Sequence, residues 1–145
     1  MNNVTKALLS GLAGAVVTTA LHETIKRVVP DAPRVDLLGM QGIAKVSVLV
    51  GNEPPEPDTA YASAMAGDLI SNGAYFGLVG AAPKDAYVAT GAILGILAGL
   101  GAVLAPPAAG LDPDYTSRTP ATAALTVALY TAGGLSAAAL YRAIQ

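Results

Sequence analysis

Four long apolar stretches dominate the chain, and three polar connections separate them. The stretches cover residues 4–29, 59–82, 87–105 and 120–144. Each is close to the roughly 20 mostly apolar residues that a helix needs to cross a bilayer. The third, YVATGAILGILAGLGAVLA, contains no charged residue. The pattern predicts an all-α integral membrane protein, a bundle of four transmembrane helices that forms a single domain over residues 1–145.

The connection between the first two stretches is the longest and has two parts. Residues 35–50 are apolar but are interrupted by polar side chains, which predicts an interfacial helix or a re-entrant segment. Residues 51–58, GNEPPEPD, are rich in proline and acidic residues, which predicts an extended, solvated linker. Before the fourth stretch, Thr119 is the predicted N-cap, and Pro120 suits the first helical position.

The composition supports membrane insertion. The chain is 53% hydrophobic and only 12% charged, with a mean hydropathy of +0.53. Soluble domains carry about 25% charged residues. The net charge of −2 leaves no basic excess for binding nucleic acid. Cysteine is absent, which excludes disulfides, thiolate metal ligands and a thiol nucleophile.

Basic residues are distributed unevenly between the two sides of the predicted bundle. Four spans place both termini on one side, and the positive-inside rule assigns the more basic side to the cytoplasm. The side opposite the termini is the more basic, so we expect the loop 30–58 to be cytoplasmic. The terminal side carries Lys6, Lys84 and Arg142, and the opposite side carries Lys26, Arg27, Arg34, Lys45 and Arg118.

Glycines recur at helical spacing in two of the stretches. Gly91, Gly95 and Gly99 form two overlapping G-x-x-x-G motifs, and Gly73 and Gly77 form a third. Such rows leave a groove without side chains, in which a neighbouring helix backbone can approach closely. The neighbour is either a helix of the same bundle or a second copy of the chain. We therefore expect close helix packing, and we expect the chain to form a homo-oligomer.

The second stretch has a polar face in its middle. Asp68, Ser71, Asn72 and Tyr75 lie at positions i, i+3, i+4 and i+7, so they share one side of a helix. A carboxylate near the centre of a spanning helix costs about 2.5–3.5 kcal/mol on insertion scales. We expect this face to point into the protein, either as an ion or solute site or as a hydrogen-bond network that fixes helix packing.

The chain's only histidine lies near the end of the first stretch, in TALHETIKRVVPDAPRVD. His22 and Glu23 come about one turn before Lys26 and Arg27. We expect the side chains of Lys26 and Arg27 to extend towards lipid headgroups. Asp36 is the predicted N-cap of the next helix. From depth and topology, His22 and Glu23 should meet Asp68 in one polar vestibule, together with Thr122 and Thr126.

The residues exclude several kinds of site. HETIK begins like the zinc motif H-E-x-x-H but lacks the second histidine, and no P-loop, dinucleotide fingerprint or nucleophile elbow is present. We therefore expect neither a cofactor nor a dedicated metal site, and enzymatic activity has no support.

Three hypotheses remain for the function. The first, which we favour, is a channel or transporter for protons, cations or a small solute that uses the polar cluster around Asp68 and His22. The second is a structural or accessory subunit that binds a partner through its glycine rows and a protein at loop 30–58. The third is a membrane-embedded metal-binding protein or enzyme centred on His22, Glu23 and Asp68.

Overall fold

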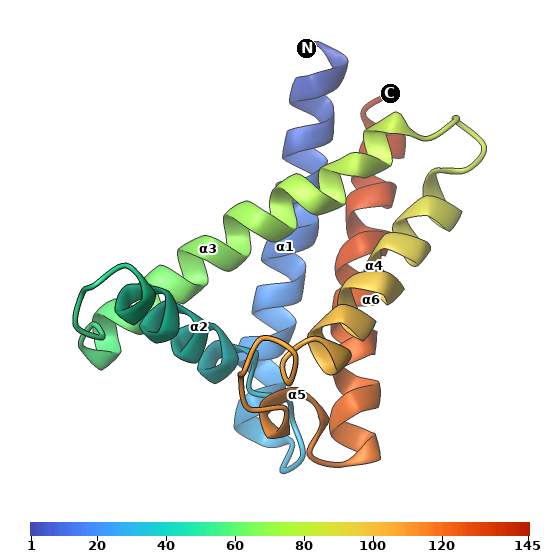
Figure 1. Cartoon of the computed structure of the whole chain (residues 1–145). Coiled ribbons are helices and arrows are strands. Elements are labelled where there is room, and N and C mark those ends of the chain that lie inside the picture. The colour runs from blue at the N-terminus through green and yellow to red at the C-terminus, as the bar shows by residue number, and fades with distance from the viewer.

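The computed structural model describes the whole chain, residues 1–145, and every regular element in it is helical (Figure 1). This confirms the predicted all-α class. The α-helices are joined by short connections and by one 3₁₀-helix, η1. In chain order the elements are α1 (Asn3–Val28), α2 (Val35–Leu49), α3 (Pro57–Gly77), η1 (Leu78–Ala81), α4 (Tyr87–Leu104), α5 (Asp114–Ser117) and α6 (Pro120–Ala143).

Three helices, α1, α4 and α6, are long and apolar enough to cross a membrane. The prediction of four spans is therefore wrong. The missing one is α3, which has 21 residues and sufficient length but not sufficient hydropathy. Its polar residues explain the difference, because Asp58, Asp68 and Asn72 interrupt the apolar sequence. The three apolar helices indicate a membrane protein.

The outward faces of α1 and α4 carry large apolar side chains. A monomeric soluble protein rarely exposes a continuous apolar surface of this kind, whereas lipid tails would solvate it. The exposed side chains include Leu8, Leu12 and Val16 of α1, and Ile93, Leu97 and Leu100 of α4.

The helices do not form a simple parallel stack. α6 packs against both α1 and α4, whereas α3 crosses α1 obliquely and makes few contacts with α4 (Figure 1). α2 packs on α3, and α5 lies near the lower ends of α1, α4 and α6 in Figure 1. The two chain termini lie at the opposite, upper end of the structure.

The glycine row of α4 faces α6 of the same chain. A Cβ atom on Gly95 would lie 2.5 Å from Thr131 Cα, and one on Gly99 would lie 2.6 Å from Val127 Cα. Both distances are far shorter than a carbon–carbon contact. The two backbones approach this closely only because the side chains are absent. The row is thus buried inside the bundle and leaves no groove for a second copy there.

A second set of glycines joins α1 to its neighbours. A Cβ on Gly11 would lie 2.5 Å from the amide nitrogen of Gly77 in α3. A Cβ on Gly14 would lie 2.5 Å from the carbonyl oxygen of Gly133 in α6. α1 is therefore in close backbone contact with two helices on adjacent turns.

Local signals set the helix ends. The backbone amide of Thr122 donates to the Thr119 hydroxyl at 3.0 Å, which confirms the predicted N-cap of α6. Asn2 caps α1 in the same way, accepting a hydrogen bond from the amide of Thr5 at 2.8 Å.

We predict that Gly95→Ala separates α4 from α6 and destabilises the protein. The new methyl group has no space against the backbone of Thr131, and overpacking costs typically 1–3 kcal/mol. Gly101→Ala on the same helix is the matched control, because a Cβ there meets no atom within 4 Å. The measurement is thermal unfolding in a non-ionic detergent, followed by circular dichroism. Equal midpoints for the two variants would contradict the close approach.

Candidate functional site

A cavity of about 690 Å³ lies between α2, α3, α4 and the loop that follows α4. The polar face of α3 forms one wall, with Asp68, Ser71, Asn72 and Tyr75 all lining the cavity. The remaining walls are mostly apolar or small. They consist of Val35, Leu38, Gly39 and Gly42 from the α2 side, Leu97, Ala98, Gly101 and Ala102 from α4, the loop residues Ala105, Pro106, Ala109 and Leu111, and Tyr130 from α6.

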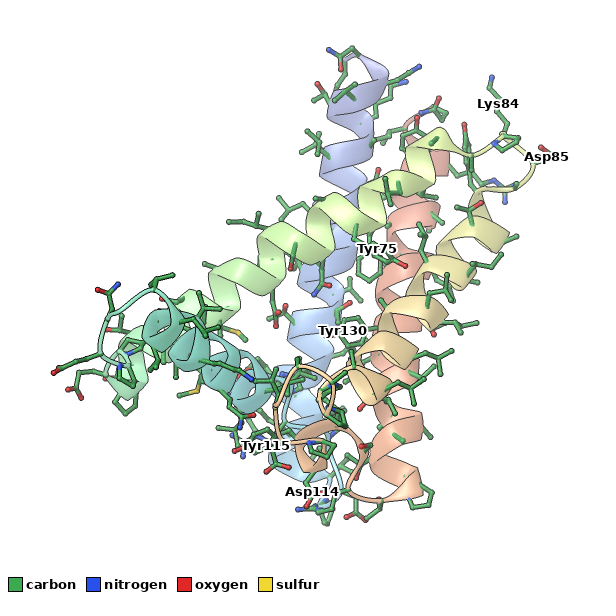
Figure 2. The ribbon with its side chains drawn as sticks, in the orientation of Figure 1. Tyr75, Lys84, Asp85, Asp114, Tyr115 and Tyr130 are labelled. Atoms are coloured by element: carbon green, nitrogen blue, oxygen red, sulfur yellow. The ribbon has the colours of Figure 1, made fainter.

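The polar groups on the α3 wall differ in how their hydrogen bonds are satisfied. The Ser71 hydroxyl donates to the carbonyl of Gly67, one turn earlier, at 2.7 Å. The Tyr75 hydroxyl donates to the carbonyl of Leu94 in α4 at 3.1 Å. Figure 2 shows Tyr75 and Tyr130 in the same opening between α3 and α4. Asp68 forms neither a hydrogen bond nor an ion pair with any group of the chain.

A second, much smaller cavity lies behind this wall. It has a volume of about 10 Å³, the lower limit for one water molecule. His22 lines it, and Asp68, Asn72 and Tyr130 line both cavities. The structure therefore brings His22 and Asp68 to the same small space, as the topology suggested, but no hydrogen bond joins them.

Asp36 organises the charged groups beyond this space. Its side chain is 3% exposed. It accepts from the Arg34 guanidinium at 3.0 and 2.8 Å and from Lys26 Nζ at 3.1 Å. Burial of the Asp36 carboxyl raises its pKa, but the hydrogen bonds from Arg34 and Lys26 outweigh burial and lower the pKa to about 2. This carboxylate joins the end of α1 to the start of α2.

His22 and Glu23 belong to the same network. The buried His22 Nε2–H donates to the carbonyl of Pro33 at 3.1 Å, which assigns the proton to Nε2 because a carbonyl only accepts. Glu23 accepts from Lys26 Nζ at 2.6 Å and lies 3.9 Å from Arg27. His22 therefore holds the turn between α1 and α2, whereas the ion pairs of Glu23 lie within α1.

Two sequence predictions about this region are wrong. Asp36 is not the N-cap of α2, because Arg34 occupies that position and Asp36 forms ion pairs instead. Lys26 does not extend to the surface as Arg27 does: its side chain is 15% exposed, against 74% for Arg27. Two carboxylates hold the Lys26 ammonium inside. The role of Asp36 was missed because its partners come from two different elements.

The threonines expected in the vestibule have a structural role. Thr126 is fully buried, and its hydroxyl donates to the carbonyl of Thr116 at 2.8 Å. The hydroxyl of Thr116 in turn donates to the carbonyl of Ala102 in α4 at 2.7 Å. Thr122 is buried and its hydroxyl pairs with that of Thr119. These contacts dock α5 between α4 and α6, and neither Thr122 nor Thr126 lines either cavity with Asp68.

Three hydrogen bonds connect α2 to the segment 105–119 at the lower end of the cavity. The ammonium of Lys45 donates to the carbonyl of Ala109. The amide of Asp112 donates to the Gln41 side chain at 2.8 Å, and the amide of Arg34 donates to the carbonyl of Tyr115 at 2.7 Å. Tyr115 and its neighbour Asp114 are labelled at the lower end of Figure 2. The predicted helix over 35–50 thus covers one side of the cavity.

Comparison with protein families, with curated proteins and with solved structures finds no match. No three His, Asp or Glu side chains gather where they could hold a metal ion. His22 is hydrogen-bonded to Pro33 in the α1–α2 turn, Glu23 pairs with Lys26, and neither joins Asp68 in a ligand set.

We predict that Asp36→Asn destabilises the protein by about 2 kcal/mol at pH 7, the value that corresponds to lowering a carboxyl pKa from 3.8 to about 2. Because the folded-state pKa is the lower one, this stabilisation is complete above about pH 4 and is lost as the pH falls towards 2. The difference between wild type and Asp36→Asn in thermal unfolding should shrink over that interval.

Asp31→Asn is the matched control. Asp31 also pairs with an arginine, Arg118, at 3.4 Å, but both side chains are about half exposed. Exposed ion pairs contribute about 0–1 kcal/mol, so this variant should unfold close to wild type. A loss in Asp31→Asn as large as that in Asp36→Asn would show that Asp36 has no special place in the network.

Proposed function

We propose that this protein is a small membrane transporter or channel that binds a proton, a cation or a small solute in the cavity between α2, α3 and α4. The observation that carries the proposal is the unpaired carboxylate of Asp68 in the wall of a cavity of about 690 Å³. Sites for small molecules are typically cavities of about 300–1,000 Å³ with mostly apolar walls and a few polar groups. This cavity has both properties.

The position of the cavity supports transport. Its α4 wall runs from Leu97 to Ala102, within a helix that is apolar enough to cross a membrane. Ionisable groups inside membrane proteins are costly, and they commonly mark ion or substrate pathways. Asp68 would then be the principal binding group, with Asn72, Ser71 and Tyr75 as its polar neighbours.

In this proposal His22 and Glu23 support the site without binding the solute. His22 is bound to the α1–α2 turn, and Glu23 pairs with Lys26, which also pairs with Asp36 at the start of α2. α2 forms one wall of the cavity. His22 also lines the small space behind Asp68. A change of His22 would therefore act on the position of α2 and on the back of the Asp68 wall.

The test is flux through liposomes that contain the purified full-length protein. The solutes are protons, Na⁺, K⁺, radiolabelled tetraethylammonium and glycerol. We expect saturable flux of at least one of them, and Asp68→Asn should reduce it at least ten-fold because the variant loses the only charge in the cavity wall.

Asp58→Asn is the matched control, since Asp58 lies on the exposed first turn of the same helix. This variant should transport like wild type. Protein-dependent flux of none of the five solutes, over a range of pH values, would contradict the proposal. So would equal flux by wild type and Asp68→Asn.

A further inference from the structure

The chemistry of the large cavity points to one class of ligand. Of the 17 residues that line it, Asp68 is the only one with a charged side chain. The chain's ion pairs use Lys26, Arg27, Arg34 and Arg118, and none of them involves Asp68. A carboxylate removed from bulk water without a cationic partner is costly. A cationic ligand would supply the partner that the chain lacks.

The other lining residues indicate the chemistry of the uncharged part of such a ligand. On the α4 side the wall consists of Leu97, Ala98, Gly101 and Ala102, which offer apolar surface and little bulk. A Cβ on Gly101 would meet no atom within 4 Å, so this wall has free space in front of it. No basic side chain is present to attract an anion. An inorganic cation would gain only one carboxylate and would leave most of the cavity unfilled.

Two aromatic rings complete the site. Tyr75 and Tyr130 line the cavity together with Asp68 (Figure 2). The faces of aromatic rings attract organic cations, by about 0.5–2 kcal/mol at each site in proteins. An ammonium or phosphonium centre near Asp68 would therefore find both a counter-charge and aromatic surface.

We infer that the cavity binds a monovalent organic cation with an apolar body, in which the cationic centre pairs with Asp68 and the apolar body lies against α4 and α2. This inference rests on the proposed function and specifies its substrate class. Leu97 is 56% exposed while lining the cavity, so the apolar wall is continuous with the outer surface of α4. A ligand of this class partitions into lipid and can reach the cavity from that side.

The first experiment compares two probes of the same shape and opposite charge. Tetraphenylphosphonium and tetraphenylborate are titrated into the full-length protein in nanodiscs, with empty nanodiscs as the blank. We expect saturable binding of the phosphonium only. Asp68→Asn should weaken it at least ten-fold, because the variant removes the only charge in the cavity wall that attracts a cation. Asp58→Asn should bind like wild type.

A second measurement covers the case in which Asp68→Asn does not fold. The chain has no cysteine, so a single Gly101→Cys introduces the only thiol, at a cavity position with free space. Tetraphenylphosphonium should slow its labelling by a maleimide. The control is Gly67→Cys, which also has free space but lies outside the cavity, and its labelling should not change.

The outcomes separate this inference from the proposed function. Binding of both probes alike, binding of neither, or full phosphonium affinity in Asp68→Asn overturns the inference. Slow labelling of Gly101→Cys without any ligand, together with a dimer in solution, also overturns it, since a second copy would then fill the cavity. Phosphonium binding without Asp68-dependent flux leaves the ligand class standing and overturns transport. Flux of protons or Na⁺ without phosphonium binding leaves transport standing and overturns the ligand class.

Discussion

Close contact between helix backbones at glycine is the constraint on which the rest of this structure depends. Gly95 and Gly99 hold α4 against α6, while Gly11 and Gly14 hold α1 against α3 and α6. Each of these contacts replaces side-chain packing with backbone packing, which is how helices associate where no water drives them together. Because α3 is bound to α1 and α4 is bound to α6, α3 and α4 make few contacts with each other. The large cavity lies where they separate.

The separation of α3 and α4 would leave the cavity open without a further wall, and α2 supplies one. α2 packs on α3, where Gly39 permits a close approach to Ala64. Its first turn is held to the end of α1 by Asp36, and its polar side chains reach the loop after α4. The charged network thus acts at a distance from the cavity by fixing the helix that covers it. Changes in the network should alter access to the cavity rather than its chemistry.

The features that could be predicted from the sequence are those that depend on neighbours along the chain. The interfacial segment over 35–50 is α2 within one residue, and the stretch 87–105 is α4 within one residue. Prolines close to the helix ends and runs of apolar residues set these limits locally. The shared face of Asp68, Ser71, Asn72 and Tyr75 also follows from helical spacing alone, and all four line one cavity.

Features that depend on contacts between distant segments could not be predicted. The glycine row of α4 was compatible with a neighbour in the same chain or in another copy, and spacing carries no information about which. Tyr87 and Tyr141 lie near helix ends, where aromatic residues of membrane proteins are commonly found at the membrane surface. In this fold they are instead buried edge to face against each other. α3 is not apolar enough to be a candidate membrane span, in part because it carries the polar face that lines the large cavity.

Two aspartates of this chain differ in how the fold compensates their charge. Asp36 is almost fully buried and has two cations of its own, so its charge is already compensated and its removal should cost stability. Asp68 lies in the wall of a cavity and has none. The chain has eight basic residues, and the fold brings two of them to Asp36 while leaving Asp68 unpaired. A protein that only needed stability would gain from an apolar residue at position 68. The cationic ligand that we propose would supply the partner that Asp68 lacks within the chain.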